Sequence, residues 1–484
     1  MNLRRILLVA VLAVTAALAF AYLLRTPRLL STSPVDGAAN IAAGAPLRLV
    51  FSQTMRPDDI TSRLSFQPPV RGAFSWEGST LVFNPSQPWP GGALVKVRLD
   101  SGARAAGLLP FAMNRAYSWS FRIGAPRLAY LYPANAAADL YLMNPITAET
   151  RRLTNFPNGV LDFDVSASGS AIFFSAANDQ TGSDLYRLDL AVPESGAPAA
   201  SPPAASATPL AASQPQLLLS CGADLCRYPR LSPLGNFMAY ERKAAPGGIS
   251  TGYPQVWLQE MDLQGHPANT GPVPAGEVQH QTLQPQWSPS NLLTFYDSTQ
   301  QEFVILEPVH GGTTRFPNQT GQAGSWDPTG EEFVAQEISF PETAVPTTTT
   351  GMESFASSHL MRFNRLDGSV LDLTQDDRIE DASPAYSPDG VFIALGRKYL
   401  DTVHWSPGRQ IWLMLANGKD AHPLTDDPDF NYFDFAWHPA NDQIAAVRFN
   451  QTSPTDLPEI WLVNPINTQA VQLIIGGYSP RWIP

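Results

Sequence analysis

The chain is 484 residues long, which exceeds what one hydrophobic core usually organises and so predicts more than one domain. Hydrophobic residues make up 44% of it, charged residues only 15%, and the 45 prolines suit an all-β protein with many turns better than a helical one. The formal net charge of -12 argues against nucleic acid as a partner, because phosphate binding needs clustered lysine and arginine.

The N-terminus carries an uncharged apolar run from Ile6 to Leu24, preceded by Arg4 and Arg5. A helix of this length, at about 1.5 Å per residue, spans roughly the hydrocarbon thickness of a bilayer. We therefore expect residues 1–28 to form a short cytoplasmic tail and a transmembrane signal-anchor. A cleaved signal peptide is the alternative, with Ala19 and Ala21 as small residues near a cleavage site.

Residues 29–125 contain short strands with period-two alternation, separated by turn residues; the clearest strands cover 47–51, 79–83, 93–99 and 117–123. This pattern predicts a compact β-sandwich. Four short motifs occur in it, namely Pro34-Val-Asp-Gly37, Phe51-Ser-Gln-Thr-Met55, the loop from Pro85 to Gly91, and Trp119-Ser-Phe121. Together they resemble bacterial immunoglobulin-like domains of the S-layer type. The resemblance implies a spacer or adhesion module without chemistry of its own.

From residue 126 to the end the sequence repeats. An apolar-aromatic strand recurs at 139–143, 184–188, 255–258, 302–305, 359–363, 410–414 and 459–463. A second strand often ends in Leu-Thr, as at 153–154, 373–374 and 424–425. A Pro-x-aromatic stretch with a turn follows, as at 285–289, 384–390 and 480–484, and then another apolar strand. Four strands about every 45–50 residues predict one propeller blade per repeat.

The turn Pro384-Ala-Tyr-Ser-Pro-Asp-Gly390 and its looser copies resemble the repeat of TolB-type propellers. We expect seven blades over residues 126–484, with six or eight as alternatives. The last repeat stops before its final apolar strand, and Arg127-Leu-Ala-Tyr-Leu131 supplies a strand of that type, so we expect the two ends of the propeller to pair and close the ring.

Two segments interrupt the repeats, a Pro/Ala/Ser-rich stretch at 193–216 and a Thr-rich stretch at 341–358. Both are expected to be flexible inserts. The chain has two cysteines, Cys221 and Cys226, which in an exported protein are expected to form a loop-closing disulfide rather than a metal site.

Catalytic motifs are missing from the sequence: there is no Gly-x-Ser-x-Gly elbow, no phosphate-binding loop, and no paired spacing among the seven histidines. We therefore expect a protein that is not an enzyme and has no metal or other cofactor. A hydrolase or lyase with carboxylates at the centre of the propeller channel stays the alternative, because such a site can be assembled from distant positions.

Acidic and aromatic residues gather in the loops that lead into three inner strands. They are Asp162, Asp164, Asp381, Asp427, Asp429, Tyr432 and Asp434. Since equivalent loops of successive blades meet around one mouth of the channel, these residues are expected to form a binding site for a basic partner segment or for calcium. The alternative is that they are solvated turn residues.

Both domains resemble kinds that are usually exported, so we expect them to lie outside the cytoplasm, in the cell envelope. The expected function is that of a membrane-anchored module that binds a protein partner or acts as an envelope scaffold. A second hypothesis is a sensor or receptor for a glycan or peptide, with Tyr432 and Phe433 stacking on a sugar.

Overall fold

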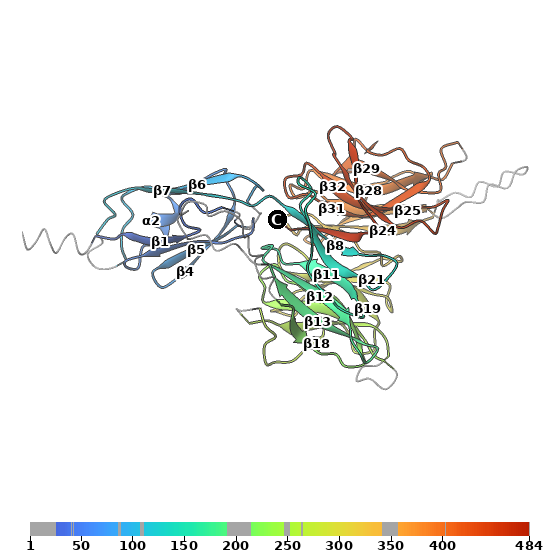
Figure 1. Ribbon diagram of the computed structural model, residues 1–484, viewed down its shortest axis with the longest axis horizontal. Helices are drawn as coiled ribbons and strands as arrows, with labels where there is room; N and C mark the ends of the chain where they lie inside the picture. The colour runs from blue at the N-terminus through green and yellow to red at the C-terminus, as the bar shows by residue number, and fades with distance from the viewer. Residues whose placement is uncertain are drawn as a thin grey trace, which may run out of the picture. The chain divides into compact units, whose positions relative to one another are not determined.

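The structure is a computed structural model, and it describes residues 26–39, 41, 43–85, 89–106, 111–190, 214–245, 252–262, 265–340, 357–401 and 403–483. The described residues divide into two compact units, one before Pro126 and one from Pro126 on (Figure 1). The predicted membrane-spanning run from Ile6 to Leu24 lies outside the described residues. Within the described ranges, no helix has the length and apolar character needed to cross a membrane.

The first unit is a two-sheet β-sandwich, as predicted. One sheet has the order β1 (Leu29–Ser33), β2 (Leu47–Phe51), β5 (Thr80–Pro85), β4 (Gly72–Glu77), and the other β3 (Leu64–Gln67), β6 (Leu94–Leu99), β7 (Tyr117–Arg122). A one-turn helix, α2, covers Pro57–Thr61. Alternate residues of β6 are buried, namely Val95, Val97 and Leu99, and they join a core that includes the fully buried Trp89. The period-two pattern therefore arises from one buried face per sheet.

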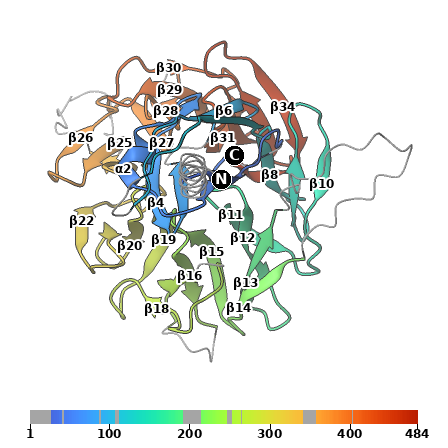
Figure 2. The ribbon, with the colours of Figure 1, turned by 90° about the vertical axis from the view of Figure 1, so that its left-hand side faces the viewer.

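The second unit is a ring of four-stranded blades (Figure 2). Blade 1 comprises β35 (Tyr478–Ile483), β8 (Arg127–Tyr132), β9 (Asp139–Met143) and β10 (Thr150–Arg152). Blade 2 comprises β11 (Val160–Val165), β12 (Ala171–Ala177), β13 (Ser183–Asp189) and β14 (Gln216–Leu219). Blade 3 comprises β15 (Leu225–Leu231), β16 (Phe237–Lys243), β17 (Gln255–Glu260) and β18 (Val273–Pro274). A parallel bridge between Ser183 and Leu225 links blades 2 and 3 into one hydrogen-bonded sheet.

The remaining blades follow the same order. Blade 4 comprises β19 (Thr282–Trp287), β20 (Leu293–Asp297), β21 (Glu302–Leu306) and β22 (Thr313–Pro317), and blade 5 comprises β23 (Ser325–Trp326), β24 (Glu332–Ser339), β25 (Ser357–Asn364) and β26 (Val370–Asp372). Blade 6 comprises β27 (Ile379–Tyr386), β28 (Phe392–Tyr399), β29 (Gln410–Leu415) and β30 (His422–Pro423), and blade 7 comprises β31 (Phe430–Trp437), β32 (Ile444–Asn450), β33 (Glu459–Val463) and β34 (Ala470–Ile475). The described strands thus form seven blades.

The ring closes as predicted. The last strand, β35, pairs antiparallel with β8, the first strand of the propeller unit, so that Trp482 lies opposite Leu128 and Ile483 opposite Arg127. Blade 1 is therefore built from both ends of the unit, and β8 is paired on both sides, with β9 and with β35.

The Pro-x-aromatic motif connects neighbouring blades. The indole N–H of Trp287, Trp437 and Trp482 donates to the backbone carbonyl of Arg230, Ala385 and Ala436 respectively, each in the preceding blade. Before the motif the inner strand carries a β-bulge with a non-glycine residue at positive φ, at Tyr228, Gln284, Ser383, Asp434 and Ser479. Such bulges change the direction in which nearby side chains point.

The cysteine prediction is confirmed, since Cys221 and Cys226 form a disulfide. The predicted inserts lie mostly outside the described residues. Their last residues do not: Gln216 begins β14, and Ser357 and Ser358 begin β25, so both inserts end slightly earlier than expected.

Candidate functional site

Charged side chains on four neighbouring inner strands form two ion pairs, which the electrostatic attraction between Arg481 and Asp164 connects; we call this set the inner-strand arc. Asp434 of β31 accepts a hydrogen bond from Nη1 of Arg481 of β35 at 2.7 Å. Burial alone would lower the pKa of Arg481, but the carboxylates of Asp434 and Asp164 together raise it. Asp164 of β11 in turn lies 3.9 Å from Nε of Arg230 of β15. The arc thus runs Asp434, Arg481, Asp164, Arg230 across blades 7, 1, 2 and 3, with alternating sign.

Asp162 makes a parallel contact between blades 2 and 3. Its Oδ2 accepts a hydrogen bond from Nε of Arg227 at 2.8 Å, and its Oδ1 accepts the backbone N–H of Tyr228, also at 2.8 Å. Burial lowers the pKa of Arg227, and the charge of Asp162 more than offsets this, so that the pKa is raised. Asp162 therefore holds the bulge of β15 in place as well as balancing a charge.

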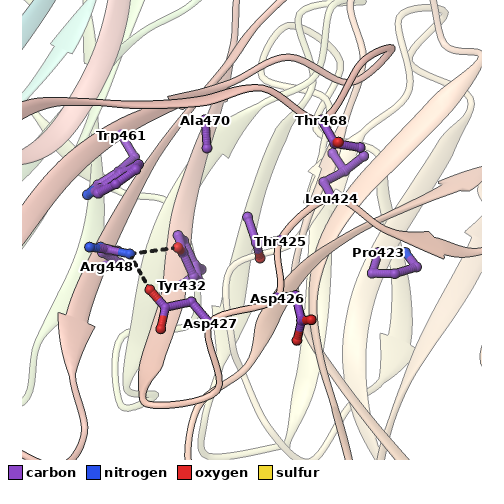
Figure 3. A pocket seen from close by; sticks show the side chains of 10 residues that line it. All are labelled: Pro423, Leu424, Thr425, Asp426, Asp427, Tyr432, Arg448, Trp461, Thr468 and Ala470. Atoms are coloured by element: carbon purple, nitrogen blue, oxygen red, sulfur yellow. Dashed lines mark hydrogen bonds and ion pairs between the residues drawn. The ribbon is translucent and has the colours of Figure 1, made fainter.

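Asp427 and Tyr432 meet at a pocket of about 430 Å³ beside β31 (Figure 3). Both contact Arg448, whose Nη1 donates to Oδ2 of Asp427 at 2.8 Å and to the hydroxyl of Tyr432 at 3.0 Å. The guanidinium also lies 3.7 Å from the ring centre of Phe430 and 3.9 Å from that of Trp461. These contacts are those of a guanidinium held between aromatic rings, so they stabilise the wall of the pocket.

The other predicted residues lie apart. Asp381 is completely buried and binds Arg397 through two hydrogen bonds of 2.6 and 2.7 Å, and it also accepts the hydroxyl of Thr374. Asp429 is exposed, and its backbone carbonyl accepts the N–H of Gln451. Phe433, expected to stack on a sugar, packs against Phe449 at 5.5 Å between ring centres.

The seven predicted residues thus take part in several separate sets of contacts, and their convergence at one mouth of the channel stays a prediction. The arginines that pair with six of them, Arg227, Arg230, Arg397, Arg448 and Arg481, were not predicted. The sequence repeat could have indicated two of these arginines. Arg230 and Arg481 occupy the same position of the repeat, between the proline and the next apolar residue. Across the described ranges, no group of three or more His, Cys, Asp or Glu side chains could hold a metal ion.

A Ser-His-Asp series of contacts occurs in blade 5. The Oγ of Ser357 lies 3.2 Å from Nε2 of His359, and Nδ1 of His359 lies 2.8 Å from Oδ2 of Asp372. The hydrogen bond to Asp372 raises the pKa of His359 despite its burial, and the charges of Asp377 and Asp381 act in the same direction. A general base must be neutral to accept a proton, and this environment favours the imidazolium, so the series is better suited to holding a loop than to activating Ser357.

Comparison with known proteins finds a family model for the first unit and several solved structures with low similarity to the chain. Residues 25–123 match the Big_5 family of bacterial Ig-like domains. A putative TolB from Agrobacterium tumefaciens is 16% identical, with 74% of this chain and 92% of that chain covered and a TM-score of 0.39. An oligogalacturonate lyase from Vibrio parahaemolyticus is 12% identical (66% and 74% covered, TM-score 0.39), and a puromycin-hydrolyzing peptidase from Mycobacterium tuberculosis is 12% identical (91% and 57% covered, TM-score 0.49).

No curated protein matches the sequence. The structural neighbours differ in kind, and at these identities and TM-scores they carry no conclusion about activity.

Proposed function

We propose that this chain is a membrane-anchored, extracytoplasmic binding module whose propeller binds a segment of a protein partner in the cell envelope. The observation that carries the proposal is the inner-strand arc. Its four charged side chains come from four different blades and are fixed by ion pairs before any partner arrives. Preorganised groups of this kind favour binding because little side-chain freedom remains to be lost.

The charges of the arc also indicate the kind of partner. Two carboxylates alternate with two guanidinium groups, so the arc has no net charge. A polyanion or a purely basic segment would meet repulsion from half of these groups, whereas a protein segment that carries both signs can match them. Complementary charges of this sort contribute mainly to specificity and to the rate of association.

The proposed location rests on two features. The apolar run from Ile6 to Leu24 is long enough to serve as a membrane anchor. The disulfide between Cys221 and Cys226 favours an oxidising compartment, since such bonds rarely persist in the cytoplasm. Protease added to intact spheroplasts should degrade the propeller, and protection of the propeller would contradict the proposed orientation.

A charge exchange within the arc tests the proposed binding. Arg481→Asp would place two carboxylates together, while Asp434→Arg combined with Arg481→Asp restores the ion pair with its signs reversed. We expect the single variant to lose both stability and partner, and the double variant to recover most of the stability but not the partner. A photo-crosslinking residue at Gln286 reports the partner in cells, with the same residue at the exposed Ile466 as control.

An adduct formed at Gln286, lost in the double variant and never formed at Ile466 would support binding at the arc. Equal adducts at both positions, or an adduct that survives the charge exchange, would place the interaction elsewhere.

A further inference from the structure

A cavity of about 350 Å³ lies beside the inner strands of blades 3 and 4. Its polar lining consists of Tyr228, Arg230, Glu241, Gln284 and Gln286. Tyr228 and Gln284 are both bulge residues with positive φ, at 52° and 55°. The repeated bulge therefore brings two polar side chains to the wall of the same cavity.

Glu241 is the carboxylate of this cavity, and its charge is poorly balanced. It accepts the backbone N–H of Gln284 at 2.6 Å, yet it makes no ion pair with any residue in the described part of the chain. The two arginines whose charges act on it form ion pairs with other residues, Arg227 with Asp162 and Arg230 with Asp164. Burial, joined by the charge of Asp162, raises the pKa of Glu241 even though Arg227 and Arg230 oppose the shift.

Gln284 adds a second acceptor. Its side-chain Oε1 is buried and, within the described ranges, has no hydrogen-bond partner. Burying a carbonyl oxygen without a donor is unfavourable, and burying a carboxylate without a positive partner is more so. A carboxylate without an ion pair and an amide oxygen without a hydrogen bond, on two residues that line one cavity, indicate that the missing group is a cation with several N–H donors.

We infer that this cavity binds the primary ammonium group of an organic ligand, with Glu241 supplying the opposite charge and Oε1 of Gln284 accepting a hydrogen bond. An ammonium group is a compact charge with three donors, which matches two acceptors in a small space. A divalent metal fits less well, because calcium takes six to eight oxygen ligands and the cavity contains a single carboxylate. Arg230 suits a carbonyl oxygen of the same ligand, as found next to the amino terminus of a peptide.

Two sources of ammonium share this chemistry, the amino terminus of a peptide and the side chain of a lysine. Isothermal titration of the full-length protein in detergent with three probes separates them: tri-alanine with a free amino terminus, its N-acetylated form, and N-acetyl-lysine amide. We expect at least one free amine to bind and acetylated tri-alanine not to bind. Glu241→Gln should weaken that binding by about 10- to 100-fold, as for the loss of a charged hydrogen bond, and Gln284→Met by less.

Stability measurements distinguish this role from a merely structural one. Glu241→Gln keeps an oxygen for the N–H of Gln284 while removing an unbalanced charge, so the melting temperature without ligand should stay equal or rise. Glu307→Gln, at an exposed turn, serves as the control and should change neither the melting temperature nor the affinity for the amine. The inference would be overturned if no free amine bound, if acetylation made no difference, or if Glu241→Gln lowered the melting temperature and left binding intact.

Amine binding at this cavity rests on the proposed function in one respect, because a segment of the protein partner would supply the ammonium group. The experiments nevertheless test the two proposals independently. Loss of the crosslinked adduct in the charge-exchanged variant depends on Asp434 and Arg481. Binding of the small amines depends on Glu241 and Gln284 and needs no protein partner.

Discussion

Asp381 illustrates how single acidic residues act in this propeller. It is fully buried and binds the guanidinium of Arg397, which is itself 6% exposed. Asp381→Ala would leave that guanidinium buried without its partner, so we expect the free energy of unfolding to fall by about 3–5 kcal/mol. Urea denaturation of the two proteins measures this difference.

Asp376 provides the matched control, since it lies just before β27, the strand that carries Asp381, and pairs with the exposed Arg378. Asp376→Ala should change stability little, because exposed ion pairs contribute little. Equal losses of unfolding free energy in both variants would mean that the buried Asp381–Arg397 pair contributes no more to stability than the exposed Asp376–Arg378 pair.

His359 should make stability depend on pH. Its folded pKa is raised above the ordinary 6.5, mainly by the hydrogen bond to Asp372. A group whose pKa is raised by folding stabilises the protein fully below its unfolded pKa and loses that contribution as the pH rises through the folded value. The wild type should therefore lose stability relative to His359→Gln as the pH rises above about 6.5.

Urea unfolding of both proteins at several pH values tests the assignment. The lowered pKa of Asp372, which follows from the contact with His359 and from backbone N–H groups, acts only below about pH 4 and does not overlap this window. Parallel pH profiles for wild type and variant would show that His359 does not titrate in this range.

At the scale of elements, the repeated motifs have structural explanations. The threonines of the Leu-Thr motif accept a backbone N–H from the third strand of their blade: Thr154 from Leu140, Thr374 from Leu360, and Thr425 from Ile411. Each hydroxyl then donates to a polar side chain, as Thr154 does to Asp139. The recurrence of this motif in sequence thus reflects a repeated loop attachment rather than a site.

Closure of the ring by β35 gives a prediction for this strand. Trp482 is 8% exposed, packs among Leu128, Tyr130 and neighbouring residues of blades 1 and 7, and donates its indole N–H to the carbonyl of Ala436. Trp482→Ala should lower the free energy of unfolding by about 3–5 kcal/mol, as large-to-small changes in a core do. Chemical denaturation is the measurement.

Trp405 is a suitable control because the same residue type is 60% exposed there. Trp405→Ala should leave the unfolding midpoint nearly unchanged. A similar small effect for Trp482→Ala would show that pairing of β35 with β8 adds little to stability.

For the molecule as a whole, the sequence was sufficient to predict the sandwich, the propeller, its closure and the disulfide. Each of these follows from local alternation or from repetition, which one sequence displays directly. The site was harder, because an ion pair such as Asp434–Arg481 joins residues 47 positions apart in sequence on different blades. The acidic loops were visible in the sequence, but their arginine partners and the cavity at Glu241 depend on which strands become neighbours in the ring.

The two units should unfold independently. The core of the first unit consists of residues between Ala38 and Ile123, with partly buried residues such as Leu29 packed against it, and the buried clusters of the second unit all lie beyond residue 126. Because no buried cluster in the described part of the chain draws on both, each unit has the core that cooperative unfolding requires. The excess heat-capacity curve of the full-length protein, measured by differential scanning calorimetry, should therefore equal the sum of the curves of fragments 29–125 and 126–484.

The same fragments show which unit binds. Fragment 126–484 should retain the binding of small amines with unchanged affinity, since Glu241 and Gln284 lie within it, while fragment 29–125 should bind none. A heat-capacity curve of the whole that differs from the sum would mean that the two units do not unfold independently. Loss of amine binding by fragment 126–484, with its melting transition intact, would contradict the assignment of amine binding to this cavity.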